Sequence, residues 1–312
     1  MRQAKVLIKK LPIIGPVVTR ICDIPKVRWM IEEYRLRKWY GPEPMKVILP
    51  HSQSPMFLNP REKRSRQVLL CKAQGQMPLK NIWHQAIKRL KPEIVIDVGV
   101  NYGEFIFGER YPDSKRVIGI EANASLKPWL EQSREQHPDK SKIQIEIAIA
   151  AESSGDSRSF FVNAQSSGRS SAVKRSTDDW SEQEAQTIAI DDLVTDLDLP
   201  NSTVVFKIDV EGYEPKVMSG MTKLVAQSKD VLGLIEFNST FIGQTGANPE
   251  EYLSYLKNHF SIVALPHKSE YKVLEEVSLD VLSDITGNKE VELDLALLSN
   301  KNLIHVLEKA SE

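Results

Sequence analysis

The chain has 312 residues, of which 41% are hydrophobic and 27% are charged, with a formal net charge of -1 at pH 7. This composition predicts a soluble globular protein with one substantial core, and the near-zero net charge provides no global field that would attract nucleic acid. The two cysteines, Cys22 and Cys71, form no Cys-x-x-Cys pair. The sequence therefore predicts neither a disulfide framework nor a zinc-cysteine cluster, and it favours the cytoplasm.

The first 40 residues carry an excess of positive charge. Ten lysines and arginines against three acidic residues give residues 1–40 a net charge of +7. Pro12, Gly15 and Pro16 interrupt the apolar run of this segment, which is too short for a membrane span of about 20 residues. We expect residues 1–40 to pack on the acidic remainder or on a second subunit of a homo-oligomer. Peripheral contact with an anionic membrane surface is the alternative.

The N-terminal part is expected to differ in character from the rest of the chain. Helical spacing of apolar residues predicts a helix over 27–40. Residues 41–80, rich in proline, are expected to form an irregular bridge with the charged run 61–66 on its surface. The sequence thus predicts an extension over 1–80 and a catalytic domain over 81–312.

From residue 81 onward, short β-branched runs alternate with helical segments. This alternation is typical of a parallel sheet with crossover helices, so the sequence predicts a Rossmann-like α/β fold with a mostly parallel, seven-stranded sheet. A break at Gly287-Asn288 allows the last strand to run antiparallel. Strands are expected at 94–98, 116–121, 143–148, 204–209, 231–237, 260–265 and 292–298, and helices at 104–111, 125–136, 214–227 and 249–259.

A Ser- and Gly-rich segment, 152–190, interrupts the alternation. Its runs FFV (160–162) and SAV (171–173) predict a β-hairpin, followed by a strand at 187–190. The serine-rich stretch 164–171 is a candidate lid, because long loops in compact domains are often functional.

The first chemical motif is a strand that ends in Asp97 and enters a turn containing Gly99, Asn101 and Gly103. Glycines let such a turn approach a nucleotide-like ligand closely, with helix amides pointing at it. The dinucleotide fingerprint would need further glycines, and Glu104 would repel a pyrophosphate. S-adenosylmethionine, a sulfonium, has no such conflict. An NAD-dependent oxidoreductase is the rival interpretation.

The next strand ends in Glu121, followed by Ala122. In this topology an acidic residue about twenty positions after the glycine turn accepts hydrogen bonds from the ribose hydroxyls of a bound nucleoside. We therefore expect Glu121 and Ala122 at the cofactor.

Acidic residues also end two later strands. Asp209 and Glu211 follow one strand and Glu236 ends the next, so all three are candidates for deprotonating an acceptor. Together with Asn238, the oxygens of Asp209 and Glu236 could bind Mg²⁺, or they could hydrogen-bond to substrate instead. His267 is a further candidate base.

Four aromatic residues could line an acceptor pocket, although burial in the core is the alternative for them. They are Trp180, Tyr213, Phe237 and Phe241.

Taken together, the motifs resemble the FkbM-type methyltransferases, over about residues 68–300. The resemblance lies in IDVGVNYGEF, in the EAN that follows the second strand, in TIAIDDL and in KIDVEGYEPKVMSG. It implies a class I methyltransferase fold, S-adenosylmethionine as methyl donor, and O-methylation of a hydroxyl on a sugar or other natural product. The implied partner is a small-molecule acceptor, glycan or lipid-linked acceptors included. A non-catalytic binding module of the same fold is a second alternative. The residues that match the family's cofactor and acidic positions are Asp97, Gly99, Asn101, Gly103, Glu121, Asp209 and Glu211.

Overall fold

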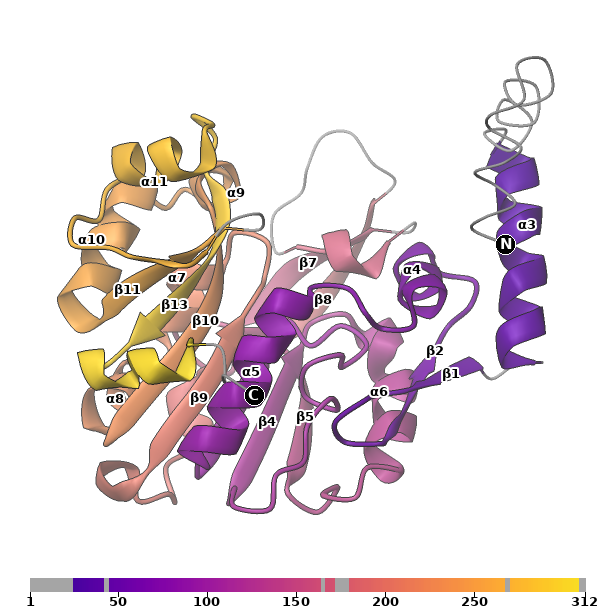
Figure 1. Cartoon of the computed structure of the whole chain (residues 1–312), viewed down its shortest axis with the longest axis horizontal. Helices are drawn as coiled ribbons and strands as arrows, with labels where there is room; N and C mark the ends of the chain where they lie inside the picture. The colour runs from indigo at the N-terminus through magenta and orange to yellow at the C-terminus, as the bar shows by residue number, and fades with distance from the viewer. Residues whose placement is uncertain (1–24, 42–44, 164–165, 172–179, 267–269, 309–312) are drawn as a thin grey trace.

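The computed structural model describes residues 25–41, 45–163, 166–171, 180–266 and 270–308, and it centres on one large sheet (Figure 1). The sheet has eight strands in the order β12-β11-β13-β10-β9-β3-β4-β5. Strand β13 runs antiparallel to both of its neighbours, as expected, and β12 is antiparallel to β11. The strands are β3 (Ile94–Val98), β4 (Arg116–Glu121), β5 (Ile143–Ile147), β9 (Thr203–Ile208), β10 (Asp230–Asn238), β11 (Ser261–Leu265), β12 (Lys272–Val273) and β13 (Glu292–Leu298).

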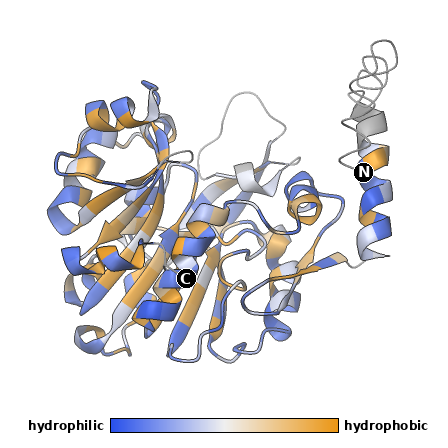
Figure 2. Ribbon diagram, viewed as in Figure 1, coloured by the Kyte–Doolittle hydropathy of each residue, from blue (hydrophilic) through white to orange (hydrophobic). Residues whose placement is uncertain are grey.

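All seven predicted strands are present, and the mostly parallel sheet is confirmed. The eighth strand, β12, is a two-residue edge strand with both residues exposed, too short to leave a pattern in the sequence. Every residue of β3 and β9 is buried. This is typical of parallel strands covered by helices on both faces, and the strands stand out as the hydrophobic centre in Figure 2.

Alternate strand residues face two separate core layers. In β3, Val95 packs in one layer, whereas Ile94 and Ile96 pack in the other. The first layer is covered by α4, α5 and α6, and the second by helices α7 to α11. The helices are α4 (Lys63–Cys71), α5 (Met77–Leu90), α6 (Lys127–Glu135), α7 (Glu214–Ser219), α8 (Thr222–Gln227), α9 (Ser239–Gln244), α10 (Pro249–His259) and α11 (Leu279–Thr286).

The predicted irregular bridge over 41–80 is wrong in its described part. A hairpin of β1 (Met45–Ile48) and β2 (Pro55–Leu58) is followed by α4 and the start of α5. The described prolines lie near the ends of these elements and do not prevent them from forming. Pro78, for example, lies in the first turn of α5, where a proline is tolerated. The hairpin and α4 share one core layer with β3, so among the described residues no separate core precedes residue 80.

The helix predicted over 27–40 is present as α3 (Pro25–Tyr40), which packs on α4. Leu36 is fully buried, the Tyr40 hydroxyl donates to the carbonyl of Leu69 at 2.7 Å, and Glu33 pairs with Arg66 at 2.9 Å. Arg66 is thereby buried, although the charged run that contains it was expected on the surface. Residues 1–24 lie outside the described part of the chain, so membrane contact by this region stays a prediction. None of the described helices combines the length and apolar character that a membrane crossing needs.

The insert after β5 forms a separate three-stranded sheet of order β6-β8-β7. The run FFV lies in β7 as predicted, but its partner is β8 and not SAV, of which only Ser171 is described and bridges Phe161. The strand expected at 187–190 begins earlier and ends at residue 188. The strands are β6 (Ile149–Ala150), β7 (Ser157–Asn163) and β8 (Trp180–Ile188).

Two helix predictions need correction. Residues 101–108 form successive turns in place of the helix expected over 104–111, and Gly103, directly before that range, has a φ of +91°. The helix expected over 214–227 is divided at Gly220, where a Cβ atom would lie 1.9 Å from the carbonyl oxygen of Ala151. The short 3₁₀ segments are η1 (Ala124–Leu126), η2 (Ser167–Arg169), η3 (Ile190–Leu193), η4 (Leu199–Asn201) and η5 (Lys301–Val306).

The chain segments that leave β3 and β9 touch each other directly. Gly99 has a φ of +80°, and a Cβ atom on it would lie 1.9 Å from the carbonyl oxygen of Asp209. The amide of Asp209 donates to the carbonyl of Val98 at 3.1 Å. This contact fixes how the two strand ends face each other.

We predict that Gly99→Ala strongly destabilises the protein. The added Cβ meets backbone that cannot move without separating β3 from β9, so the loss should exceed about 3 kcal/mol. Gly155→Ala is the matched control, because Gly155 also has a positive φ but nothing within 4 Å of its Cβ position; it should lose only about 1–2 kcal/mol. Urea unfolding measures both, and equal losses would contradict the close approach at Gly99.

Candidate functional site

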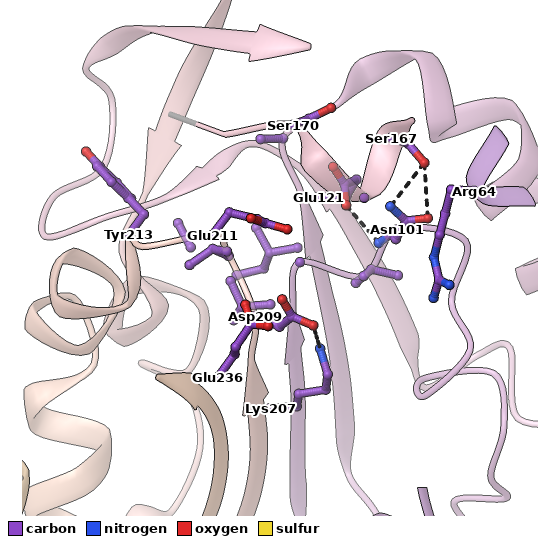
Figure 3. A pocket seen from close by; sticks show the side chains of 18 of the residues that line it. Arg64, Asn101, Glu121, Ser167, Ser170, Lys207, Asp209, Glu211, Tyr213 and Glu236 are labelled. Carbon is purple, nitrogen blue, oxygen red and sulfur yellow. Dashed lines mark hydrogen bonds and ion pairs between the residues drawn. The ribbon is translucent and has the colours of Figure 1, made fainter. Parts of the chain in front are cut away.

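A cavity of about 460 Å³ lies where β3, β4, β9 and β10 end at their carboxyl edge (Figure 3). Open α/β sheets place their ligands at this edge. Segments from α4 and from the insert complete the wall. The predicted site residues that line it are Gly99, Asn101, Glu121, Ala122, Asp209, Glu211 and Glu236.

Asp97 and Gly103 do not line the cavity. Asp97 is 1% exposed and is buried beneath it. Burial raises the pKa of Asp97 to about 6, although the ammonium of Lys207, 4.0 Å away, favours the charged form. Asp97 therefore lies against Lys207 and not at the cavity wall, and its role in cofactor binding stays a prediction.

Glu121 is a buried carboxylate held by two backbone amides. Asn101 donates to Oε2 and Asn123 donates to Oε1, both at 2.8 Å. Burial raises the pKa of Glu121, and the two amides oppose this shift. Each carboxylate oxygen keeps a further lone pair. Glu121 is thus held firmly at the cavity wall while still able to accept hydrogen bonds from a ligand.

A buried lysine lies under the acidic end of the cavity. The ammonium of Lys207 is 3.0 Å from Oδ2 of Asp209 and 4.9 Å from the ring centroid of Phe105. Burial alone would lower the pKa of Lys207, but the charges of Asp209 and Asp97 outweigh it and raise the pKa. Lys207 was missed as a site residue, although a lysine inside the apolar run VVFKI was a signal for it.

Glu236 lies beside Asp209, on the neighbouring strand (Figure 3). The charge of Asp209, then burial and the charge of Glu211, raise the pKa of Glu236 to about 10. Glu236 therefore holds a proton to higher pH than an ordinary carboxyl does. Its expected role as a base stays a prediction.

Glu214 shapes the turn that presents Glu211 and was also missed. Its Oε1 accepts the amides of Val210 at 3.0 Å and Gly212 at 3.2 Å, and burial raises its pKa to about 7. Glu211 itself has a φ of +59°, unusual for a residue with a side chain. The sequence signal was the carboxylate directly before Pro215 at the helix start.

The three residues considered as magnesium ligands are placed differently. Asp209 and Glu236 line the cavity, but Asn238 does not; its side-chain oxygen accepts the amide of Phe241 at 3.0 Å and caps α9. Magnesium binding stays a prediction. His267 lies outside the described residues.

Of the four aromatic candidates, the cavity wall contains only Tyr213. Phe237 is fully buried and stacks on Tyr252, with ring centroids 6.3 Å apart. Trp180 and Phe241 do not reach the wall. The core interpretation holds for Phe237.

Glu104 is not a free negative charge. Lys80 lies 2.7 Å from its Oε1, and the guanidinium of Arg64 contacts its other oxygen. Two cations therefore lie against the carboxylate that was expected to repel a pyrophosphate, and they reduce its effect. Both partners come from the N-terminal helices α4 and α5, which the sequence did not place at the site.

The described part of the serine-rich stretch lies over the cavity. The Ser167 hydroxyl lies 3.2 Å from Nδ2 and 3.3 Å from Oδ1 of Asn101. The Ser167 amide donates to Oε1 of Glu62 at 2.9 Å. Glu62 also caps α4 by accepting two amides of its first turn. The insert, the glycine turn and α4 thus meet at one point, as a lid would require; movement of this segment stays a prediction.

The order of the strands, with β13 antiparallel between β10 and β11, defines the α/β fold of class I methyltransferases. A sequence match to the methyltransferase FkbM domain covers residues 97–262, and the chain belongs to this family. No curated protein matches the sequence.

Several solved structures are similar to this one. The methyltransferase FkbM from Methylobacillus flagellatus KT has 14% identity and a TM-score of 0.39, with 88% of this chain and 60% of that chain covered. The O-methyltransferase TomG from Streptomyces achromogenes, in complex with SAM, has 12% identity and a TM-score of 0.38, with 72% and 80% covered. An O-methyltransferase from Bacillus cereus, in complex with SAH, has 9% identity and a TM-score of 0.39, with 70% and 80% covered.

The raised pKa of Glu236 makes the free energy of unfolding depend on pH. Its folded pKa of about 10 lies above the ordinary 4.5, so the folded state binds a proton that the unfolded chain has lost, and stability falls as pH rises through this window. Glu236→Gln should raise the Tm by about 2–6 °C at pH 8 and leave it unchanged within about 1 °C at pH 4.5. Glu292→Gln, at an exposed position on β13, is the control. A gain at pH 8 no larger than that of the control would contradict the assignment.

Proposed function

We propose that this protein is an S-adenosylmethionine-dependent O-methyltransferase acting on a hydroxyl of a small molecule. The observation that carries the proposal is the acidic end of the cavity: Asp209, Glu211 and Glu236 lie so close together that the first two raise the pKa of the third, and Lys207 is the ammonium beside them. Such a site favours a ligand with positive charge. S-adenosylmethionine brings a sulfonium and an ammonium, whereas the pyrophosphate of NAD would add negative charge.

The residues at the cavity fit this donor. Glu121 would hold the ribose hydroxyls through its free lone pairs, and Gly99 and Asn101 lie in the turn beside it. Ile149 and Phe160 offer apolar contact to the purine ring. The bound donor supplies an electrophilic methyl group.

The chain's own contribution is to position the acceptor and to receive its proton. The Lys207 ammonium lies 3.0 Å from Oδ2 of Asp209 and fixes the position of this carboxylate. Asp209 would accept the hydroxyl proton as the new bond forms, and the protonated Glu236 would donate a hydrogen bond to the acceptor. Two neighbouring carboxyl groups in different protonation states are a common arrangement for acid and base roles.

The acceptor is proposed to be a sugar or another hydroxyl-rich natural product, glycan or lipid-linked molecules included. Support comes from the polar side chains of the insert, Ser166, Ser167 and Ser170, and from the aromatic Tyr213 on the same wall. Hydroxyl groups and an aromatic face together suit a polyhydroxylated substrate.

Donor binding tests the role of Glu121. Glu121→Ala removes a buried acceptor of two ribose hydrogen bonds and should weaken S-adenosylmethionine binding by about 1.5–3 kcal/mol in calorimetry. Glu146→Ala, on the adjacent strand β5 and outside the cavity, should leave affinity unchanged. Wild-type protein should bind S-adenosylmethionine and not NAD. Tighter binding of NAD would reject the proposed donor.

Turnover tests the role of Asp209. With radiolabelled S-adenosylmethionine and a small-molecule extract of the source cells, Asp209→Asn should reduce methyl transfer at least about a hundredfold while donor affinity stays within a few-fold. Asp196→Asn, which removes an exposed ion pair with Arg116, is the control. EDTA should leave the wild-type rate unchanged. A wild-type protein that binds the donor but never transfers the methyl group would instead support a non-catalytic module.

A further inference from the structure

Three potential metal ligands meet outside the cavity described above. They are His51 from the turn after β1, His84 from α5 and Glu109 from the turns after β3, and their ligand atoms all lie within 4.8 Å of one another. Nδ1 of His51 lies 2.6 Å from Oε1 of Glu109, and Nδ1 of His84 lies 2.7 Å from Oε2. Each oxygen of one carboxylate therefore faces a different imidazole.

The charge balance of this cluster favours a cation. The Glu109 side chain is only 7% exposed, and within the described part of the chain its ion-pair partners are the two histidines, with no lysine or arginine. The two rings lie 3.8 Å apart, so charging both of them would place like charges in contact. One carboxylate with only imidazoles as ion-pair partners thus lies in a largely buried place, and a divalent ion would compensate its charge.

The backbone holds the ligands in place before any ion binds. The amide of Ser52 donates to the carbonyl of Gly108 at 3.0 Å, which joins the residues next to His51 and Glu109. His137 contacts the carbonyl of Glu109 at 2.9 Å and restrains the same turn. Supporting contacts of this kind orient ligands in metal sites.

The cluster also has room for a further ligand. It lies at the boundary of two cavities of about 710 and 270 Å³, both of which include His51 and Glu109 in their walls. Side-chain exposures of 33% for His51 and 26% for His84 give an ion access from solvent. Two imidazoles, one carboxylate and an open position form a ligand set that Zn²⁺ uses in proteins.

We propose that His51, His84 and Glu109 bind one Zn²⁺-type divalent ion, with water as the fourth ligand. The ion replaces the protons between the imidazoles and the carboxylate, and the N–O separations widen by roughly half an ångström to fit bonds of about 2 Å. It ties the β1–β2 hairpin to α5 and to the turns after β3. Imidazole and carboxylate ligands select Zn²⁺, Co²⁺ or Ni²⁺ over Mg²⁺. The site is independent of the proposed methyl transfer.

Metal titration of the full chain tests this proposal. Protein freed of metal with a chelator, and then of the chelator, is titrated with Co²⁺, followed by its visible absorption, and with Zn²⁺ in competition with a chromophoric chelator. We expect one ion per chain, at least a hundredfold weaker binding in His51→Ala and Glu109→Gln, and a Tm raised by Zn²⁺ in the wild type alone. His51 is partly exposed, so its variant keeps the fold; circular dichroism verifies this for both.

Two controls separate this site from other metal binding. His259→Ala removes an exposed histidine on α10, and Asp209→Asn alters the acidic cavity; both should bind Zn²⁺ like the wild type. Absence of saturable binding by the wild type would overturn the proposal. So would unchanged binding in His51→Ala and Glu109→Gln, or loss of binding in Asp209→Asn.

Discussion

The buried ammonium of Lys207 is the interaction on which the acidic edge of the sheet depends. It lies between Asp97, 4.0 Å away, and Asp209, 3.0 Å away, at the ends of two adjacent parallel strands. Without it, the buried carboxylate of Asp97 would face the charge of Asp209 with no ammonium between them, and the pKa of Asp97 would rise further. The charge of Asp209 also raises the pKa of Glu236 on the next strand. One cation thus lies at the centre of the acidic groups at this edge.

The parts of the fold that the sequence predicted are those with a strong local pattern. Six of the seven apolar runs are mostly buried on both faces, a pattern that a strand inside the sheet accommodates, and the seventh, IQIEI at the sheet edge, alternates. The predictions failed where tertiary contacts decide the structure. Gly220 divides one predicted helix because of a close backbone contact, and Gly103, with its positive φ, precedes turns where a helix was expected. The described prolines in 41–80 lie at or near the ends of hairpin strands and helices in a region that was predicted to be irregular.

The sequence predicted which acidic residues lie at strand ends, but it could not predict how the charges of these residues interact. Glu121 and Asp209 line the cavity, as their places at the strand ends suggested. The pKa of a carboxyl group depends on neighbours distant in sequence, so the sequence could not predict the pairing of Glu104 with Arg64 or the raised pKa of Glu236. Asn238 shows the same limit, because its role as a helix cap is visible only when α9 is present.

The position of β13 has a consequence for the order in which the molecule can be assembled. This strand is made after β11, yet it lies between β10 and β11 and joins them (Figure 1). During synthesis on the ribosome, β11 has no place beside β10 until residues 292–298 have emerged. The hydrophobic edge of β10 therefore stays uncovered while the preceding residues are made, and the sheet closes in one late step. Nascent chains that stop before this strand would expose that edge, which is a form that cellular chaperones bind.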